Sequence, residues 1–415
     1  MTFNLGVSSE VFYFSKGEID SKGAERNGLY SFNEESKKLV LIRYFEGNVV
    51  RFMLAPGAVV FVEQQGFRKT VNYYNIKSKI LLTSELPDFV SFAYPISTND
   101  SKLLLLKLNS DLNSKRVPWN LETNTILFGE NFEKEMLESP EFSVSVSFKL
   151  VPSFDGTLVP IRMLSKKGVA LENVPVYMEV YGGFGAQQSL LPRNNPIVHE
   201  FIKRGGLYIG TGVRGGNEFG ERWHKAAILE KKHKTFEDLA AIAKSLIETG
   251  VSVREKIAIR GRSNGGLVTA ATALFYPQYF GLAIAENGVL DMLAKERLDT
   301  RFNEGWSDEY GDSRRPVDFE FLSKFSPLEN IAKAIDGSSF LIVNGRKDSR
   351  VSPAHSFKFA MAASDIRSAG RKIDVETISL NNTGHHASDS DGDYIGLRAQ
   401  LIIWTRIYDQ MGMQF

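Results

Sequence analysis

The 415-residue sequence contains no cysteine, and this absence excludes several kinds of protein. Without thiols the chain cannot form a disulfide framework or a thiolate zinc site, and it has no cysteine nucleophile. It also has no apolar run of about 18 residues, so we expect no membrane-spanning helix. The segment Met1–Gly6 contains no basic stretch followed by an apolar one, so we expect no signal peptide. These absences predict a cytoplasmic protein.

An excess of charge of either sign is also lacking. Lysine and arginine together number 50, and aspartate and glutamate number 49, which leaves a net charge of +1. This balance gives no reason to expect nucleic acid or an anionic membrane surface as a partner. Hydrophobic residues make up 43% of the chain and charged residues 24%, which is ordinary globular usage and argues against disorder and coiled coils.

The chain divides into two regions with different patterns. Residues 1–145 contain short alternating or β-branched runs between turn residues, for example Val11–Phe14, Leu39–Tyr44 and Ala58–Val62. No helical pattern persists there, so we predict antiparallel β structure. In residues 146–415, apolar strand-like runs alternate with amphipathic helical segments. This alternation predicts an α/β domain on a mostly parallel sheet.

The β-rich region contains three similar segments. Each consists of an aromatic residue, an asparagine, a polar turn and an apolar strand, and they are Phe32–Leu39, Tyr74–Leu81 and Trp119–Ile126. Their starts lie 42 residues (32 to 74) and 45 residues (74 to 119) apart, about the length of a four-stranded propeller blade. The region therefore holds about three blades, fewer than a closed propeller needs. The alternative is three unrelated hairpins with common turn chemistry.

Strand and helix signals follow one another through the second region. The predicted strands are Met178–Tyr181, Leu207–Thr211, Lys256–Ile259 and Phe340–Val343, and the predicted helices are Phe236–Glu248, Leu267–Phe275 and Leu397–Met411. Between a predicted strand and a predicted helix, Gly261–Gly265 fits the pattern Gly-x-Ser-x-Gly with Ser263 at its centre. A strand-to-helix turn this tight holds the serine in a strained conformation, and its glycines let two backbones approach. We therefore predict that Ser263 is a nucleophile.

A serine hydroxyl needs a base to accept its proton and a third group to orient that base. On the α/β-hydrolase fold these follow the serine in the order acid and then histidine. Asp348 follows the strand 340–343, and His385 follows another apolar stretch, so both are expected at the carboxyl edge of the sheet. His386 is the alternative base. His355 follows Asp348 too closely, and we interpret it as a packing or surface residue.

These residues, with others in order along the chain, resemble the catalytic domain of the prolyl oligopeptidase family, serine peptidases that cleave short peptides after proline. The resemblance covers the C-terminal 270 residues and rests on separate motifs: Asp155–Thr157 with Val159–Pro160, Tyr181–Phe184, Arg214–Gly220 with Trp223–Lys225, Ser263–Gly266, Asp348–Val351 and Gly384–His385. It implies that Ser263 is the nucleophile, Asp348 the orienting acid and His385 the base. It also implies an α/β-hydrolase fold preceded by a β-propeller.

The resemblance further implies an oxyanion hole and a proline pocket. The oxyanion hole would consist of the Asn264 backbone N–H and the Tyr181 hydroxyl, two donors directed at the developing negative charge. The residues implied for substrate binding are Phe184, Asn264, Val289, Trp306, Tyr310, Arg350 and Val351. Aromatic side chains suit a flat pyrrolidine ring, and Arg350 would hold a substrate carbonyl. The alternative for Phe184 and Trp306 is ordinary core packing.

Two departures from the family pattern stand out. Arg262 occupies the position before the nucleophile where the family usually has glycine. Its side chain would either add a charge beneath the Ser263 turn or point to solvent. The N-terminal region is too short for the seven-bladed propeller of full-length members. It would form an open β cap or be closed by a partner chain. Because an incomplete propeller exposes strand edges, we predict a homodimer.

The sequence leaves three functions in competition. The first is a serine peptidase that cleaves after proline, and the second is a carboxylesterase that acts on short acyl esters with the same triad. The third is a non-catalytic binding protein. The small-molecule partner is thus a small peptide or an ester, and we expect no cofactor. We also expect no metal, because no histidine pair has the HExxH spacing.

Overall fold

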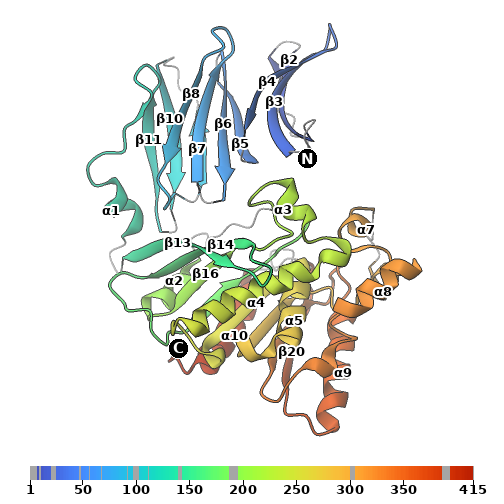
Figure 1. The fold of residues 1–415 in the computed structure, drawn as a ribbon. Coiled ribbons are helices and arrows are strands. Elements are labelled where there is room, and N and C mark those ends of the chain that lie inside the picture. The colour runs from blue at the N-terminus through green and yellow to red at the C-terminus, as the bar shows by residue number, and fades with distance from the viewer. Residues whose placement is uncertain are drawn as a thin grey trace. The chain divides into compact units, whose positions relative to one another are not determined.

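The computed structural model describes residues 7–8, 11–19, 25–45, 48–55, 57–66, 68–90, 92–96, 102–110, 112–138, 143–186, 195–299, 304–385 and 393–414. The chain forms two compact units, which we describe separately (Figure 1). Unit 1 comprises Met1–Val146, Leu191–Asn195 and Asn217–Arg222, and unit 2 comprises Ser147–Leu190, Pro196–Gly216 and Trp223–Phe415.

Unit 1 contains three antiparallel sheets of four strands each (Figure 1). Within each sheet, strands that follow one another in the chain lie side by side. The strands are β1 (Val7–Ser8), β2 (Val11–Ile19), β3 (Glu25–Asn33) and β4 (Lys38–Phe45); β5 (Asn48–Ala55), β6 (Ala58–Gln65), β7 (Arg68–Asn75) and β8 (Leu81–Leu86); and β9 (Phe92–Ile96), β10 (Leu103–Asn109), β11 (Ser114–Asn120) and β12 (Thr125–Ile126). Four antiparallel strands in chain order are the composition of a propeller blade.

The three similar sequence segments occupy the same place in the three sheets. Each forms the turn between the third and fourth strands, and the asparagine of each is the last residue of the third strand. The side-chain oxygens of Asn33, Asn75 and Asn120 accept hydrogen bonds from the backbone N–H three residues later, at 2.7, 2.9 and 3.1 Å. One residue further on, all three turns have a positive φ, of 52°, 62° and 52°. The repeated motif therefore encodes one turn used three times.

The predicted strands of this region are present, and one helix was not predicted. That helix is α1 (Phe132–Leu137), which buries Phe132 and Met136 against the core of unit 1. Trp119 lies at the centre of the same core and is fully buried, and its indole N–H donates to the Asn124 side chain at 3.1 Å. Only two apolar residues of α1 face the core, so its sequence has too few repeats to reveal a helical period.

Unit 2 is built on an eight-stranded sheet with the order β13-β14-β16-β15-β17-β18-β19-β20. The strands are β13 (Val144–Pro152), β14 (Leu158–Lys166), β15 (Val176–Glu179), β16 (Leu207–Thr211), β17 (Ile257–Arg262), β18 (Leu282–Glu286), β19 (Ser339–Gly345) and β20 (Asp374–Leu380). The pairs from β16 through β20 are parallel, whereas β14 pairs antiparallel with β16. The predicted, mostly parallel α/β fold is thus confirmed.

Helices flank this sheet (Figure 1). The helices described after β15 in the chain are α2 (Pro196–Lys203), α3 (Glu221–Lys225), α4 (His233–Glu248), α5 (Asn264–Phe275), α6 (Lys295–Leu298), α7 (Glu304–Tyr310), α8 (Pro316–Phe325), α9 (Ala354–Ser368) and α10 (Asp393–Met411). Short 3-10 helices cover Leu229–Lys231, Arg254–Lys256, Pro277–Tyr279 and Ile331–Lys333. No helix in the described part of the chain is long and apolar enough to cross a membrane.

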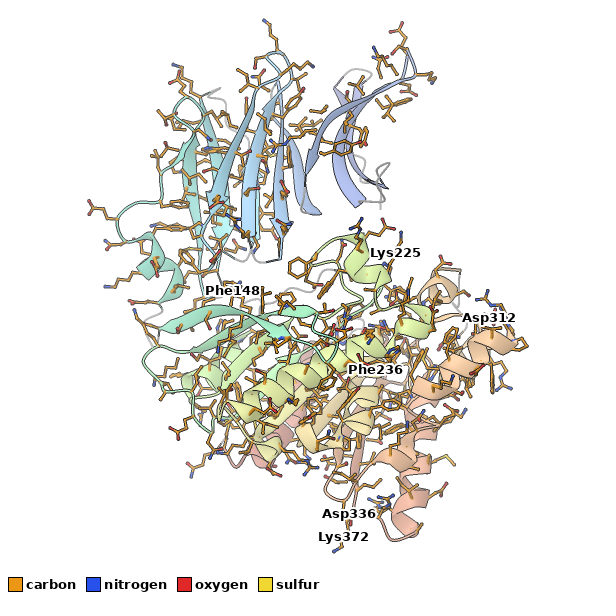
Figure 2. All side chains as sticks on the ribbon, in the orientation of Figure 1. Phe148, Lys225, Phe236, Asp312, Asp336 and Lys372 are labelled. Carbon is orange, nitrogen blue, oxygen red and sulfur yellow. The ribbon has the colours of Figure 1, made fainter. Side chains whose placement is uncertain are left out.

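Alternation along the strands separates two helix layers. Tyr177 of β15 packs against Phe201 of α2 and Trp404 of α10, with ring centroids 6.2 and 4.8 Å away. Its neighbour Met178 belongs to the core cluster that contains Phe236 of α4. Figure 2 labels Phe236, which stacks on Phe275 of α5 at 6.4 Å. Because successive strand residues point to opposite faces, both faces of the sheet are covered.

Candidate active site

The predicted nucleophile lies at a sharp turn between β17 and α5. Ser263 has φ 58° and ψ −119°, a conformation that is rare for residues with a side chain and confirms the predicted strain. Its backbone N–H donates to the Glu286 carbonyl at 2.8 Å, which ties the turn to the neighbouring strand β18. Its hydroxyl makes no capping hydrogen bond to α5 in the described structure. The hydroxyl is therefore not used to hold the helix.

Glycine is required on both sides of Ser263. A Cβ atom at Gly261 would lie 2.3 Å from the Gly265 carbonyl oxygen. A Cβ atom at Gly265 would lie 2.4 Å from the Val180 carbonyl oxygen. Because both obstacles are backbone atoms, neither can move aside without distorting the sheet edge. This close approach brings the amino end of α5 against the loop that follows β15.

The predicted acid and base are joined by a hydrogen bond. Asp348 follows β19 and His385 follows β20, and Asp348 Oδ2 lies 2.7 Å from His385 Nδ1. The other carboxylate oxygen, Oδ1, accepts the backbone N–H groups of Arg350 and Val351 at 2.8 and 3.0 Å. The side chains of Asp348 and His385 are buried, with 1% and 8% of their surface exposed. The carboxylate is thus fixed at one oxygen and presents the other to the imidazole.

The other histidines considered as bases have different positions. His355 is fully buried in α9, where Nε2 lies 3.1 Å from the Asp299 carboxylate and Nδ1 accepts the Asp291 backbone N–H at 3.0 Å. Of the two interpretations from the sequence, packing or surface, the structure supports packing. His386 lies outside the described residues.

Asn287 was not predicted, yet its side chain connects the loops that carry the acid and the base. Its Nδ2 donates to the His385 carbonyl at 2.7 Å, and its Oδ1 accepts the Gly345 backbone N–H at 2.9 Å. Its own backbone has φ 44°, which asparagine tolerates better than most residues. The signal in the sequence that marks this position is Asn287-Gly288 directly after the apolar run Leu282–Ala285.

The two predicted oxyanion donors come from adjacent elements. The Asn264 backbone N–H belongs to the first turn of α5, where N–H groups precede any acceptor within the helix. The Asn264 side chain is fully buried: its Nδ2 donates to the Tyr181 carbonyl, and its Oδ1 accepts the Tyr310 hydroxyl at 2.9 Å. The helix start and the Tyr181 loop are therefore held together by this amide.

The hydroxyl of Tyr181 remains protonated over a wide pH range. Burial raises its pKa to about 12; the nearby negative charge of Glu309 adds to this effect, and the positive charge of Arg350 opposes it. A protonated phenol is a hydrogen-bond donor, which is the state that an oxyanion requires.

Three of the predicted pocket residues form an aromatic cluster. The Tyr310 ring meets the Phe184 ring edge-on at 5.4 Å and the Trp306 ring edge-on at 5.9 Å. Phe184 and Trp306 are only partly buried, whereas Tyr310 is 1% exposed. Phe184 has φ 56°, a strained backbone conformation for a residue with a bulky side chain. Val289 and Val351 are buried in the same core cluster.

The predicted triad is not fully hydrogen-bonded within the described residues. Among the described residues, no hydrogen bond joins Ser263 to His385, although the acid and base are paired. The Arg350 side chain is exposed and forms no ion pair within the described part of the chain. Catalytic hydrogen bonds are often long before substrate binds, so this geometry is compatible with the predicted roles.

The Arg262 side chain forms an ion pair beside the Ser263 turn rather than pointing freely to solvent. Its guanidinium lies 2.9 Å from the Glu286 carboxylate, which also pairs with the buried Arg260. Burial alone would raise the pKa of Glu286, but the charges of Arg260 and Arg262 overcome this effect and lower the pKa to about 2. The backbone carbonyl of Glu286 also accepts the Ser263 N–H, so the residue that carries this charge is hydrogen-bonded to the nucleophile's backbone.

No group of three or more metal-binding side chains is present within the described residues.

The model of the prolyl oligopeptidase family matches residues 195–406. The chain belongs to the prolyl oligopeptidase family. The recognition from sequence motifs is thus confirmed.

Individual relatives show the same family and fold. The chain is 35% identical over 241 residues to a prolyl endopeptidase of Dictyostelium discoideum, covering 56% of this chain and 31% of that protein. It is 32% identical over 252 residues to a prolyl endopeptidase of Elizabethkingia meningoseptica, covering 60% and 35%. A solved prolyl endopeptidase structure matches with a TM-score of 0.83 at 22% identity, covering all of this chain and 60% of the other.

The sequence matches span about a third of the length of these curated relatives. The likeness to the solved structure establishes the fold, an α/β-hydrolase domain preceded by a β-rich region.

Proposed function

We propose that this protein is a serine peptidase that cleaves peptide bonds on the carboxyl side of proline. The observation that carries the proposal is the Asp348–His385 pair, which lies at the same sheet edge as the strained Ser263 turn. All three residues lie in the connections after parallel strands of one sheet, at the edge where open α/β folds bind their ligands.

In this proposal the reaction proceeds through an acyl-enzyme. Ser263 Oγ attacks the carbonyl carbon while His385 Nε2 accepts the hydroxyl proton, and Asp348 holds Nδ1–H so that Nε2 is the basic nitrogen. The Tyr181 hydroxyl and the Asn264 N–H donate to the oxyanion of the tetrahedral intermediate. His385 then gives its proton to the leaving amine. Water, activated by the same imidazole, releases the acid and restores Ser263.

The aromatic cluster supports proline as the residue before the cleaved bond. Phe184, Trp306 and Tyr310 present ring faces and edges to one another, and a flat pyrrolidine ring packs well on such surfaces. Arg350 is exposed, and its backbone is fixed by Asp348, so its guanidinium is available to bind a substrate carbonyl. The relatives named prolyl endopeptidase agree with this specificity.

Other predictions from the sequence accompany this proposal. A carboxylesterase would use the same triad on an ester, and a binding protein would use none of it. A cytoplasmic location and a homodimer also remain predictions.

Hydrolysis of Z-Gly-Pro-anilide and p-nitrophenyl butyrate, measured side by side, tests the proposal. We expect the wild-type protein to release the anilide and Ser263→Ala to lose this activity while retaining its thermal unfolding temperature. Ester cleavage without anilide cleavage would contradict the peptidase and indicate an esterase. Failure to cleave either substrate, with no labelling by a fluorophosphonate, would indicate the binding protein.

A further inference from the structure

A buried carboxylate outside the predicted site, that of Glu309, connects the loop after Tyr181 to α7, the helix that carries Trp306 and Tyr310. Glu309 lies in α7 next to Tyr310, and only 1% of its side-chain surface is exposed. It accepts hydrogen bonds from three separate segments: the Phe184 backbone N–H at 2.9 Å, His224 Nε2 at 2.7 Å and Lys232 Nζ at 2.6 Å. All of these residues belong to unit 2.

Lys232 completes the connection from the other side. Its side chain is fully buried, and Nζ donates to the Gly182 carbonyl at 2.9 Å as well as to Glu309. The ammonium also lies 5.6 Å from the centroid of the Tyr310 ring, within range of a cation–π interaction. The pair therefore holds the carbonyl of Gly182 and the N–H of Phe184, which flank Gly183 in the turn that follows β15.

This turn needs to be held because its backbone is strained. Gly182, Phe184 and Gly185 have φ values of 59°, 56° and 56°. For a bulky residue such as Phe184 this conformation is unfavourable by about 1 kcal/mol or more. Such strain persists only where surrounding contacts determine the backbone. Here those contacts are the Glu309 and Lys232 hydrogen bonds and the Asn264 amide on the Tyr181 carbonyl.

Stability alone does not account for a fully buried ion pair. Removing two charges from water is costly, and apolar residues of similar volume often give an equally stable or more stable protein. What apolar residues cannot do is hold a backbone carbonyl and a backbone N–H in defined positions. The negative charge of Glu309 also helps to raise the pKa of the Tyr181 phenol.

We propose that Glu309 and Lys232 are positioning residues that set the place of the Tyr181 hydroxyl for oxyanion stabilisation. The inference rests on the proposed function in so far as Tyr181 is the oxyanion donor. Displacement of a catalytic group by about 1 Å reduces rates by about 10²-fold, so small shifts of this turn are sufficient. The loss of rate should appear in kcat, because the hydrogen bond from the Tyr181 hydroxyl strengthens as the oxyanion forms.

A double-mutant cycle between Glu309→Gln and Tyr181→Phe tests this inference. We expect Glu309→Gln alone to lower kcat for Z-Gly-Pro-anilide by about 10²-fold. In the Tyr181→Phe background the same substitution should have little further effect on kcat, because the hydroxyl that it positions is gone. Equal losses in both backgrounds, or an unchanged kcat in Glu309→Gln, would overturn the inference.

Two further variants separate positioning from folding. His224→Phe removes one donor to Glu309 without leaving a buried charge unpaired, and it should lower kcat in the same Tyr181-dependent manner. A kcat loss independent of Tyr181 would contradict the inference.

The matched control is Glu296→Gln, since Glu296 pairs with the buried Lys295 and binds Ser313 rather than the turn. It should lower the unfolding temperature and leave kcat unchanged; a kcat loss that depends on Tyr181 would overturn the inference.

The test also distinguishes its own failure from that of the proposed function. If the wild-type protein does not cleave the anilide, the peptidase proposal fails. The cycle is then measured with p-nitrophenyl butyrate, whose hydrolysis forms an oxyanion at the same donors. Coupling between residues 309 and 181 on the ester would support the positioning role in an esterase, and additivity would overturn it.

Discussion

Three non-glycine residues with positive φ lie at the carboxyl edge of the sheet in unit 2. Ser263, Phe184 and Asn287 all lie in loops that follow parallel strands, and all three have φ between 44° and 58°. Each is held there by named hydrogen bonds: Ser263 by Glu286, Phe184 by Glu309, and Asn287 by Val343. Strain of this kind is maintained where the geometry of a site depends on it.

The Tyr181 hydroxyl gives a prediction for the pH dependence of the reaction. Its pKa is raised to about 12, so the donor stays protonated throughout the working pH range and should not limit the rate on the alkaline side below about pH 11. We expect Tyr181→Phe to lower kcat/KM by about 10²–10³-fold at every pH, the usual effect of losing one oxyanion donor. A kcat/KM–pH profile of both proteins checks this. An alkaline limb near neutral pH that disappears in the variant would contradict it.

Asp348 gives a second prediction at the same scale. Asp348→Asn keeps an oxygen for the Arg350 and Val351 N–H groups, so the fold should be preserved. The amide cannot hold His385 in the required tautomer, and we expect kcat to fall by about 10⁴-fold. Steady-state kinetics and circular dichroism measure the two effects. A folded variant with a nearly normal rate would show that Asp348 does not orient the base.

At the scale of the elements, strands and turns were predicted more completely than the contacts between loops. The strand Leu207–Thr211 was predicted with its observed bounds, because a short apolar run between turns identifies a buried strand. The helix before residue 248 starts at His233 rather than Phe236, since its first turn is polar and lacks a capping side-chain bond in the described structure.

Contacts between loops carry no local pattern. The sequence indicated Ser263, Asp348 and His385 through their spacing after strands. Asn287 and Glu309 act through backbone atoms of segments distant in sequence, 98 and 125 residues away in the two longest cases. A single sequence does not reveal which carbonyl or N–H such a side chain will meet.

The repeated turn of unit 1 gives a prediction at this scale. Asn75→Ala removes the side-chain oxygen that accepts the Lys77 and Ser78 N–H groups at 3.1 and 2.9 Å. We expect a loss of about 1 kcal/mol in the free energy of unfolding, comparable with the loss of a helix cap. Urea denaturation measures it, with Lys77→Ala as the control because that side chain is exposed. Equal stability of both variants would mean that the turn does not depend on asparagine.

At the scale of the whole molecule, buried charge inside the sheet of unit 2 links stability to pH. The pKa of Glu286 is lowered to about 2, so between about pH 4.5 and pH 2 the unfolded chain binds a proton that the folded chain does not. The stabilisation is complete above the unfolded pKa and is lost as the pH falls through the folded pKa.

Removal of this carboxylate gives the corresponding prediction. Glu286→Gln leaves the buried Arg260 without its counter-ion, and we expect a loss of about 3–5 kcal/mol in the free energy of unfolding. The acid-dependent part of the stability should decrease as well. Urea unfolding at several pH values measures both effects. The control Glu255→Gln alters an exposed ion pair and should change stability by less than about 1 kcal/mol. Similar effects of both substitutions would contradict this account of Glu286.

Ser263 is proposed to hydrolyse peptide bonds after proline. The most direct test of this claim is the mass of the fragments formed from a short peptide that contains one internal proline and one internal alanine, incubated with the wild-type protein and with Ser263→Ala. We predict cleavage only on the carboxyl side of proline, and none with Ser263→Ala. An intact peptide with the wild-type protein, or cleavage that persists in Ser263→Ala, would contradict the claim.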